Sequence, residues 1–169
     1  MLFSLTFSEY YSNIRLFNFR VKKVIHFMNP LDIVSLNTIA SKLYENVCRP
    51  ICRKYDLNQT CFDVILFLAN NPSHNTARDL CELRGIRTGN ASVAIETLAK
   101  RGFLTRSQDS SDRRIQRLIL TDLADPVTEE GRLAQEKFGT LLNAGISHAD
   151  LEQAWHVLQK IQQNILSNL

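Results

Sequence analysis

The segment SSDRRIQRLILTD, residues 110–122, places three arginines, Arg113, Arg114 and Arg117, directly before and within an apolar stretch. Guanidinium groups stay charged at physiological pH and present several N–H donors in one plane, which suits them to phosphate and carboxylate groups. Basic residues are concentrated around this segment. Residues 78–121 contain nine basic and five acidic residues, whereas residues 122–169 contain three basic and seven acidic residues. This distribution indicates a surface that binds a polyanion.

Other chemistry has little support in the residue types and their spacing. Four cysteines in a chain of 169 residues favour reduced thiols over a disulfide framework. None of the four histidines stands at zinc-site spacing from a cysteine, so no metal is expected. The chain contains no nucleotide-binding glycine motif and no well-supported nucleophile motif. We therefore expect neither an enzyme nor a bound cofactor.

The sequence also argues against a membrane span or a secretory signal. It has no run of about 18 apolar residues, and its N-terminal segment lacks the order of charges and apolar residues of a signal peptide. A cytoplasmic protein without a membrane partner is the expectation.

Hydrophobic periodicity predicts the helices that precede the arginine-rich segment in the chain. Apolar residues at three- and four-residue spacing from Leu31 to Tyr55 predict a long amphipathic helix, which Pro50 should kink. Asn58 can cap a second helix, and a capping box of Thr76 and Asp79 predicts the start of a short third one. These signals describe a helical protein up to about residue 83.

A helix, a turn and a hairpin follow. The fourth helix is predicted from a cap at Thr88 to Arg101, where Gly102 closes it. The runs FLTRS and IQRLILT are then β-prone and are joined by QDSSDRR, so the arginines would lie at the tip of a hairpin. The order helix, turn, helix, hairpin is that of a winged helix-turn-helix.

The chain from Asp122 onwards is predicted to return to helix, with Asp125 capping one helix and Ser147 capping the last. These helices and the long first helix carry more apolar surface than the small winged unit could cover. A second copy of the chain is the natural cover, in a two-fold dimer.

Residues 57–121 resemble the MarR/SlyA family of winged-helix transcriptional regulators. The stretches LNQTCFDVILFL, TARDLCELRGI and ASVAIETLAKRGFLTR are similar to the family's helices, and DSSDRRIQRLILT matches its wing signature in every element. With the terminal helices, the resemblance spans about residues 31–168. Two positions depart from the pattern. Val93 stands where many members carry an arginine, and Ala124 where the family usually has a glycine.

The resemblance implies a fold class that is mainly α with a small β-hairpin wing: a winged helix-turn-helix DNA-binding domain plus N- and C-terminal dimerisation helices. The implied boundaries are an N-terminal extension of uncertain role (1–28), a dimerisation helix (29–56), the winged helix-turn-helix domain (57–121) and C-terminal dimerisation helices (122–169).

The implied function is a homodimeric, sequence-specific regulator, expected to be a repressor, that binds a pseudo-palindromic operator in double-stranded DNA. Its affinity would respond to a small-molecule effector or to thiol oxidation. A recognition helix reads base edges in the major groove. The candidate reading residues here are Thr88, Asn90, Ser92, Val93 and Glu96.

In the wing, the resemblance implies that Arg114 enters the minor groove and that Asp112 holds it in place. Arg113 and Arg117 would meet phosphates or lie along the strand. Some family members sense oxidants through a thiol, which makes Cys48, Cys52 and Cys81 candidate redox residues. The alternative is that these cysteines serve as small hydrophobic side chains.

Two alternatives stay open. The winged helix could be a protein-interaction module without specific DNA binding, which would use the acidic C-terminal half as its contact surface. The first 27 residues, which hold five of the nine phenylalanines, could form an extra helix at the dimer interface or on DNA. Equally, synthesis could normally begin at Met28.

Overall fold

The computed structural model describes residues 30–169. The predicted N-terminal extension, residues 1–28, therefore lies outside the described residues. The chain divides after Ile39 into two units. The first described helix, α2 (Pro30–Lys54), begins in one unit and ends in the other, and it continues through Pro50 to Lys54.

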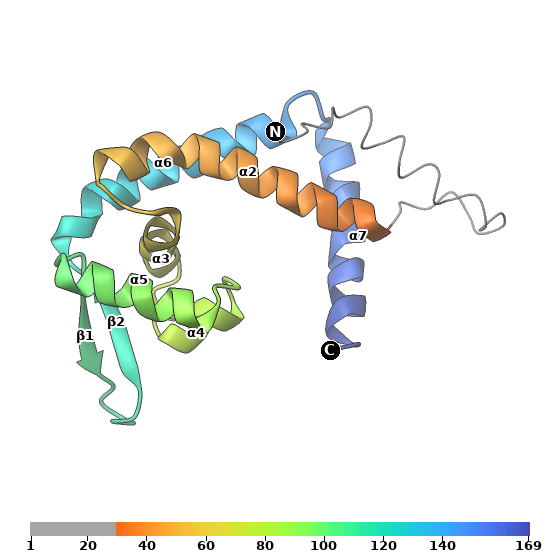
Figure 1. The fold of residues 1–169 in the computed structure, drawn as a ribbon. Helices are drawn as coiled ribbons and strands as arrows, with labels where there is room; N and C mark the ends of the chain where they lie inside the picture. Colours follow the sequence, from red (N-terminus) through yellow and green to blue (C-terminus); the bar gives the residue numbers. More distant parts are fainter. Residues whose placement is uncertain (1–29) are drawn as a thin grey trace, which may run out of the picture. The chain divides into compact units, whose positions relative to one another are not determined.

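The second unit contains the predicted order of helix, turn, helix and hairpin (Figure 1). Its elements are α3 (Gln59–Asn70), α4 (Ala77–Glu82), α5 (Thr88–Lys100), β1 (Leu104–Gln108) and β2 (Gln116–Leu120). The two strands pair antiparallel, from Leu104 opposite Leu120 to Gln108 opposite Gln116. The predicted fold class is confirmed: the structure is mainly helical, with one two-stranded hairpin among the described residues.

The core of this unit is built around α3. Phe62 and Ile65 of α3 are fully buried, as are Leu80 of α4 and Leu98 of α5. α3 packs against α5, α6 and β2, so one apolar helix holds α5, the hairpin and α6 together. Burial of apolar side chains of this size stabilises the fold by about 1.5–3 kcal/mol each.

Helices α3 and α4 begin with the capping hydrogen bonds that the sequence predicts. The Asn58 side chain accepts a hydrogen bond from the Cys61 backbone N at 2.8 Å. Thr76 and Asp79 form a complete capping box, in which each side chain accepts from the other residue's backbone N–H. Both predictions are confirmed. They could be made from the sequence because each bond joins residues only three positions apart.

The predicted cap at Asp125 is wrong. A short 3-10 turn, Asp122–Ala124, leads directly into α6 (Asp125–Asn143), whose N-cap position is Ala124 and has no side-chain cap bond. Ala124 is fully buried with φ −82°, an ordinary helical value that needs no glycine. The departure from the family pattern at this position therefore leaves the start of α6 intact.

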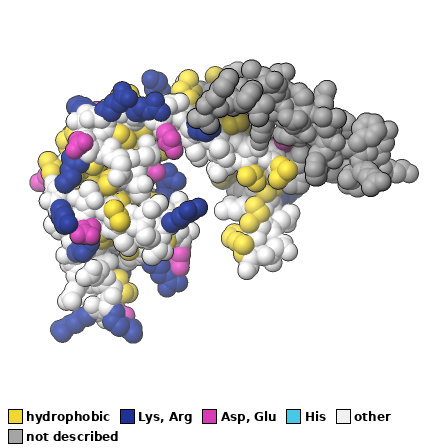
Figure 2. Space-filling model, in the orientation of Figure 1, with side chains coloured by type: hydrophobic (Ala, Val, Ile, Leu, Met, Phe, Trp, Pro, Cys, Tyr) yellow, Lys and Arg dark blue, Asp and Glu magenta, His cyan; other side chains and the backbone are white. Residues whose placement is uncertain are grey.

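The last helix, α7 (His148–Leu166), begins at the predicted cap, since Ser147 Oγ accepts from the Asp150 backbone N at 3.2 Å. None of its side chains is buried. Trp155 is 59% exposed, and the other large apolar residues that α7 leaves exposed are Val157, Leu158, Ile165 and Leu166. The hydrophobic side chains visible on α7 in Figure 2 are part of this uncovered surface.

Candidate nucleic-acid interface

Helix α5, the predicted recognition helix, buries one narrow face and exposes the rest. Ala91, Ala94, Ile95 and Leu98 are buried against the core. The predicted reading residues all lie on the exposed side of the helix: Thr88, Asn90, Ser92, Val93 and Glu96. Val93 is 64% exposed although it is apolar. The first half of α5 is slim, because its side chains are small, and it is accessible to a large ligand.

The predicted cap at Thr88 is wrong. The N-cap residue is Arg87, whose side chain makes no capping bond, and Thr88 is the first helical residue. Thr88 Oγ1 instead lies 3.8 Å from Cys81 Sγ. The side chain of the cap residue therefore accepts no bond from the first backbone N–H groups of α5. The N-terminus of α5, which is the positive end of the helix dipole, is exposed at the surface.

Glu96 is occupied by a neighbour on the same helix. Lys100 Nζ lies 2.8 Å from Glu96 Oε1, one turn further along. The hydrogen bond from Lys100 lowers the pKa of Glu96, so this carboxylate stays ionised. A base that reads Glu96 would have to compete with Lys100.

At the tip of the hairpin, two aspartates organise the turn. Asp109 accepts hydrogen bonds from Ser111 Oγ and from the backbone N of Ser111 and Asp112. Asp112 accepts from Arg114 Nη2 at 2.8 Å and from Arg114 Nε at 3.0 Å. These bonds lower the pKa of both aspartates, with Ser111 the largest cause at Asp109 and Arg114 the largest at Asp112.

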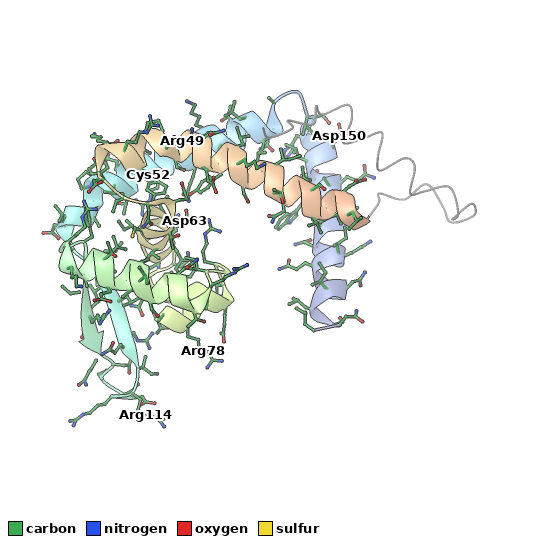
Figure 3. The ribbon with its side chains drawn as sticks, in the orientation of Figure 1. Arg49, Cys52, Asp63, Arg78, Arg114 and Asp150 are labelled. Atoms are coloured by element: carbon green, nitrogen blue, oxygen red, sulfur yellow. The ribbon has the colours of Figure 1, made fainter. Side chains whose placement is uncertain are left out.

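The wing arginine is presented to solvent. The Arg114 side chain is 90% exposed and points away from the body of the molecule at the end of the hairpin (Figure 3). Arg113 beside it is also exposed. Figure 2 shows Lys and Arg side chains gathered at this tip. The predicted pairing of Asp112 with Arg114 is present, so the guanidinium is oriented before any ligand binds.

Arg117 has a different environment from the other two. Its Nε donates to Asp109 Oδ2 at 2.7 Å, and its Nη1 donates to Asn75 Oδ1 at 3.1 Å. The Leu118 backbone N also donates to the Asn75 carbonyl O, at 2.7 Å. Arg117 therefore lies along the strand, one of the two positions expected for it, and connects β2 of the wing to the loop before α4.

The turn before α5 is held by a second arginine. Arg84 Nη2 lies 3.2 Å from Asp63 Oδ2 of α3, while the Arg78 side chain on α4 is 82% exposed and pairs with Glu82 one turn along the same helix (Figure 3). Burial raises the pKa of Asp63, and the Arg84 charge opposes that shift. Arg78 is thus available at the surface, whereas Arg84 is part of the scaffold.

Two of the three candidate redox cysteines are buried. Cys48 has no exposed surface and Cys52 is 8% exposed. Burial raises the pKa of Cys48 to about 11 and also raises the pKa of Cys52. Cys81 is only partly buried. The thiols of Cys48 and Cys52 are thus poor nucleophiles near neutral pH, because the thiolate is the reactive form.

A small cavity of about 180 Å³ opens beside Cys52 and is lined by Glu45, Arg49, Cys52 and Gln59. Among residues 30–169, no group of three or more metal-ligating side chains is close enough to hold an ion. Within the same residues, no helix has the length and hydropathy to cross a membrane.

Comparisons with known proteins decide the family. The family model described as MarR family matches residues 55–115. The HTH-type transcriptional regulator YwaE of Bacillus subtilis is 30% identical over 149 residues, which cover 82% of this chain and 86% of that protein. The chain belongs to the MarR family. It is therefore a transcriptional regulator, and the expectation that it is not an enzyme is confirmed.

Solved structures agree with this fold. A MarR family transcriptional regulator from Listeria monocytogenes, in complex with a 26mer DNA, superposes with a TM-score of 0.72 at 18% identity, over 84% of this chain and 92% of that one. The MepR–DNA complex of S. aureus gives a TM-score of 0.66 at 14% identity, over 77% and 93% of the two chains. At such identities the likeness concerns the winged-helix fold.

Sequence reasoning missed three residues of this surface. Asn75 and Asp109 were not expected to hold Arg117, and Asp63 was not expected to hold Arg84. Only Asp109 left a signal in the sequence, as the first acidic residue of the wing signature. Asn75 and Asp63 are 42 and 21 residues from their arginines, so nothing in the local pattern could have paired them.

Proposed function

We propose that this protein is a homodimeric, sequence-specific DNA-binding repressor that recognises a pseudo-palindromic operator. The observation that carries this proposal is the exposed, slim first half of α5 next to a hairpin whose tip presents an oriented arginine. Membership of a family of transcriptional regulators supports it, as do two similar structures that were solved with bound DNA.

In the major groove, the exposed residues of α5 supply the base contacts. The Asn90 amide can donate to and accept from adenine, and the exposed Val93 methyl groups suit a thymine methyl. Thr88 and Ser92 can bond a phosphate or a base edge. Glu96 can accept from a cytosine amino group only where its bond to Lys100 is exchanged.

In the minor groove, Arg114 is the reading residue. A narrow A·T-rich groove concentrates negative potential and favours a guanidinium. Asp112 restricts Arg114 to one orientation, which reduces the entropy lost on binding. Arg113 is placed to meet a phosphate, and Arg117 acts through the wing because its Nε and Nη1 already donate to Asp109 and Asn75.

A second copy of the chain covers the helices outside the winged domain. In this proposal residues 29–56 and 122–169 form the dimer, and residues 57–121 form the reading head. The exposed apolar residues of α7 support it, and so does the first part of α2, where Leu31, Val34, Leu36 and Ile39 are each more than half exposed. Clusters of exposed large apolar side chains on a helix mark interaction sites.

Control by an effector also belongs to the proposal. A ligand changes DNA affinity only if it binds one spacing of the two heads better than another. The cavity beside Cys52 is one place for a small molecule. Oxidation of Cys48 or Cys52 is less well supported, because both thiols are buried and their pKa values are raised.

The test is selection of a DNA duplex from a random-sequence library by the full chain, followed by footprinting of the selected sequence and a mass measurement of the complex. We expect a two-fold symmetric footprint with half-sites about 10 base pairs apart. We also expect an affinity that falls steeply as salt is raised. A monomer that enriches no sequence over random duplex would favour the protein-interaction module instead.

A further inference from the structure

Arg101 joins the end of the recognition helix to the end of α2. It is the C-cap residue of α5, next to Gly102 with its positive φ of 79°. Its Nη2 donates to the Tyr55 carbonyl O at 2.8 Å, and its Nη1 donates to the Asp56 carbonyl O. The Asp56 carboxylate lies further off, 3.9 Å from Nη1. The two residues that accept these bonds directly follow the last residue of α2, Lys54.

The chemistry of this contact favours a fixed geometry. The last carbonyl groups of a helix lack intrahelical partners and carry the negative end of the helix dipole. A guanidinium is the side chain that can donate to two such oxygens at once from one plane. The Arg101 side chain is only 34% exposed and its guanidinium carbon lies 5.3 Å from the centre of the Phe103 ring, which is itself buried.

The same end of α2 is also held from the other side. Glu130 of α6 accepts from Lys54 Nζ at 2.5 Å and from Tyr55 Oη at 2.7 Å. Asp56, with φ 50°, then turns the chain sharply into α3. The C-terminal end of α2 is therefore a junction at which α5 and α6 are both fastened by side chains.

We propose that Arg101 is a positioning residue that sets the orientation of the recognition helix relative to α2 and, through it, the distance between the two reading heads. This inference rests on the proposed dimeric DNA-binding function. Arg101 lies at the opposite end of α5 from the reading residues, so it acts on DNA binding through the helix. Its loss leaves each head able to read its half-site but leaves the spacing of the heads poorly defined.

The experiment compares full-chain variants on one set of duplexes. The duplexes carry the operator selected by the wild-type chain, the same operator with one base pair inserted or deleted between the half-sites, and a single half-site. Arg101→Gln removes the positive charge and the two guanidinium nitrogens that bind the carbonyls. Arg101→Lys keeps the charge but reaches only one carbonyl at a time. Arg53→Gln is the matched control, because it removes an exposed positive charge from the same end of α2.

Asp56→Asn is the second control. It removes the carboxylate but leaves both carbonyl acceptors in place, so we expect wild-type behaviour. Circular dichroism and the mass of the protein in solution verify that each variant is folded and dimeric. If Arg101→Gln fails to fold, Arg101→Lys alone decides the question.

We expect Arg101→Gln to bind the intact operator about tenfold more weakly and to lose most of its preference for the correct spacing, with an unchanged affinity for the single half-site. Arg101→Lys should show a smaller loss in the same direction. Wild-type affinity and spacing preference in the folded arginine variants would overturn the inference, as would equal losses in Arg53→Gln. Failure of the wild-type chain to select any operator would instead refute the proposed function.

Discussion

Two glycines of α6 provide a direct test of how the C-terminal half of the chain packs on the reading head. Gly131 is buried against Leu66 of α3, and a Cβ added there would overlap Leu66 Cδ2 and lie 2.9 Å from Leu66 Cδ1. Gly139 lies about two turns further along the same helix, and a Cβ there would have no atom within 4 Å. We compare Gly131→Ala with Gly139→Ala.

The two substitutions share one energy term and differ in another. Replacing glycine by alanine inside a helix stabilises it by about 1 kcal/mol, because the unfolded chain loses freedom. At Gly131 the new methyl group must displace Leu66, whose side chain belongs to the core and is only 2% exposed. Overpacking of this kind costs about 1–3 kcal/mol. The helix term cancels in the comparison, so Gly139→Ala should be the more stable variant by about 1–3 kcal/mol.

The assay is urea unfolding of both variants and the wild-type chain at one protein concentration, because assembly makes apparent stability depend on concentration. In thermal unfolding the same difference corresponds to about 2–4 °C for each kcal/mol. Equal stabilisation by the two alanines would refute the reasoning. It would mean that Leu66 moves without cost and that α3 and α6 are not closely packed at Gly131.

Three further predictions concern the wing and the thiols. Arg114→Ala should leave the circular dichroism spectrum unchanged, since the side chain is 90% exposed, and should weaken binding to the selected operator about tenfold or more in a mobility-shift assay; unchanged affinity would remove the wing from the mechanism. Arg117→Gln should speed hydrogen exchange of the Leu118 amide, because the bonds that hold the wing to Asn75 are weakened; lost DNA binding with unchanged exchange would show instead that Arg117 contacts DNA directly. A thiol reagent should modify Cys81 before Cys48, because the Cys48 pKa of about 11 leaves about one thiol in a thousand ionised at pH 8. The rate of Cys48 labelling should rise about tenfold per pH unit below that pKa. Peptide mass mapping that finds Cys48 modified first would contradict the burial argument.

Features that depend on neighbours in the sequence could be predicted. The caps at Asn58, Thr76 and Ser147 each accept from a backbone N–H three residues away, so the sequence contains both partners. The hairpin was equally readable, because β-prone runs on both sides of a polar turn can pair only in antiparallel register. The pairing of Asp112 with Arg114 is local in the same way.

The two wrong caps show where local reasoning fails. Thr88 and Asp125 are residue types that cap helices well, but in the structure each is already the first residue of its helix. The preceding segments decide this. The turn before Thr88 is fixed by the bond from the Ile86 backbone N to the Leu80 carbonyl O, and a 3-10 turn precedes Asp125. The backbone conformation of these preceding segments thus sets the first residue of each helix, and it outweighs a capping preference of about 1 kcal/mol.

The nine basic residues of the segment from 78 to 121 do not all contribute free charge to a DNA surface. The side chains of Arg101 and Arg117 are each 34% exposed, and both donate within the fold: Arg101 to the Tyr55 carbonyl O, and Arg117 to Asp109 and Asn75. An exposed pair such as Arg78 with Glu82 can exchange its carboxylate for a phosphate at little cost, since surface ion pairs of this kind are weak. An arginine bound to backbone carbonyls at a helix end would leave those carbonyls unpaired if it turned to DNA. The charge count of the sequence therefore combines two classes of arginine, and only the exposed class, which includes Arg78, Arg113 and Arg114, should contribute to the salt dependence of operator binding.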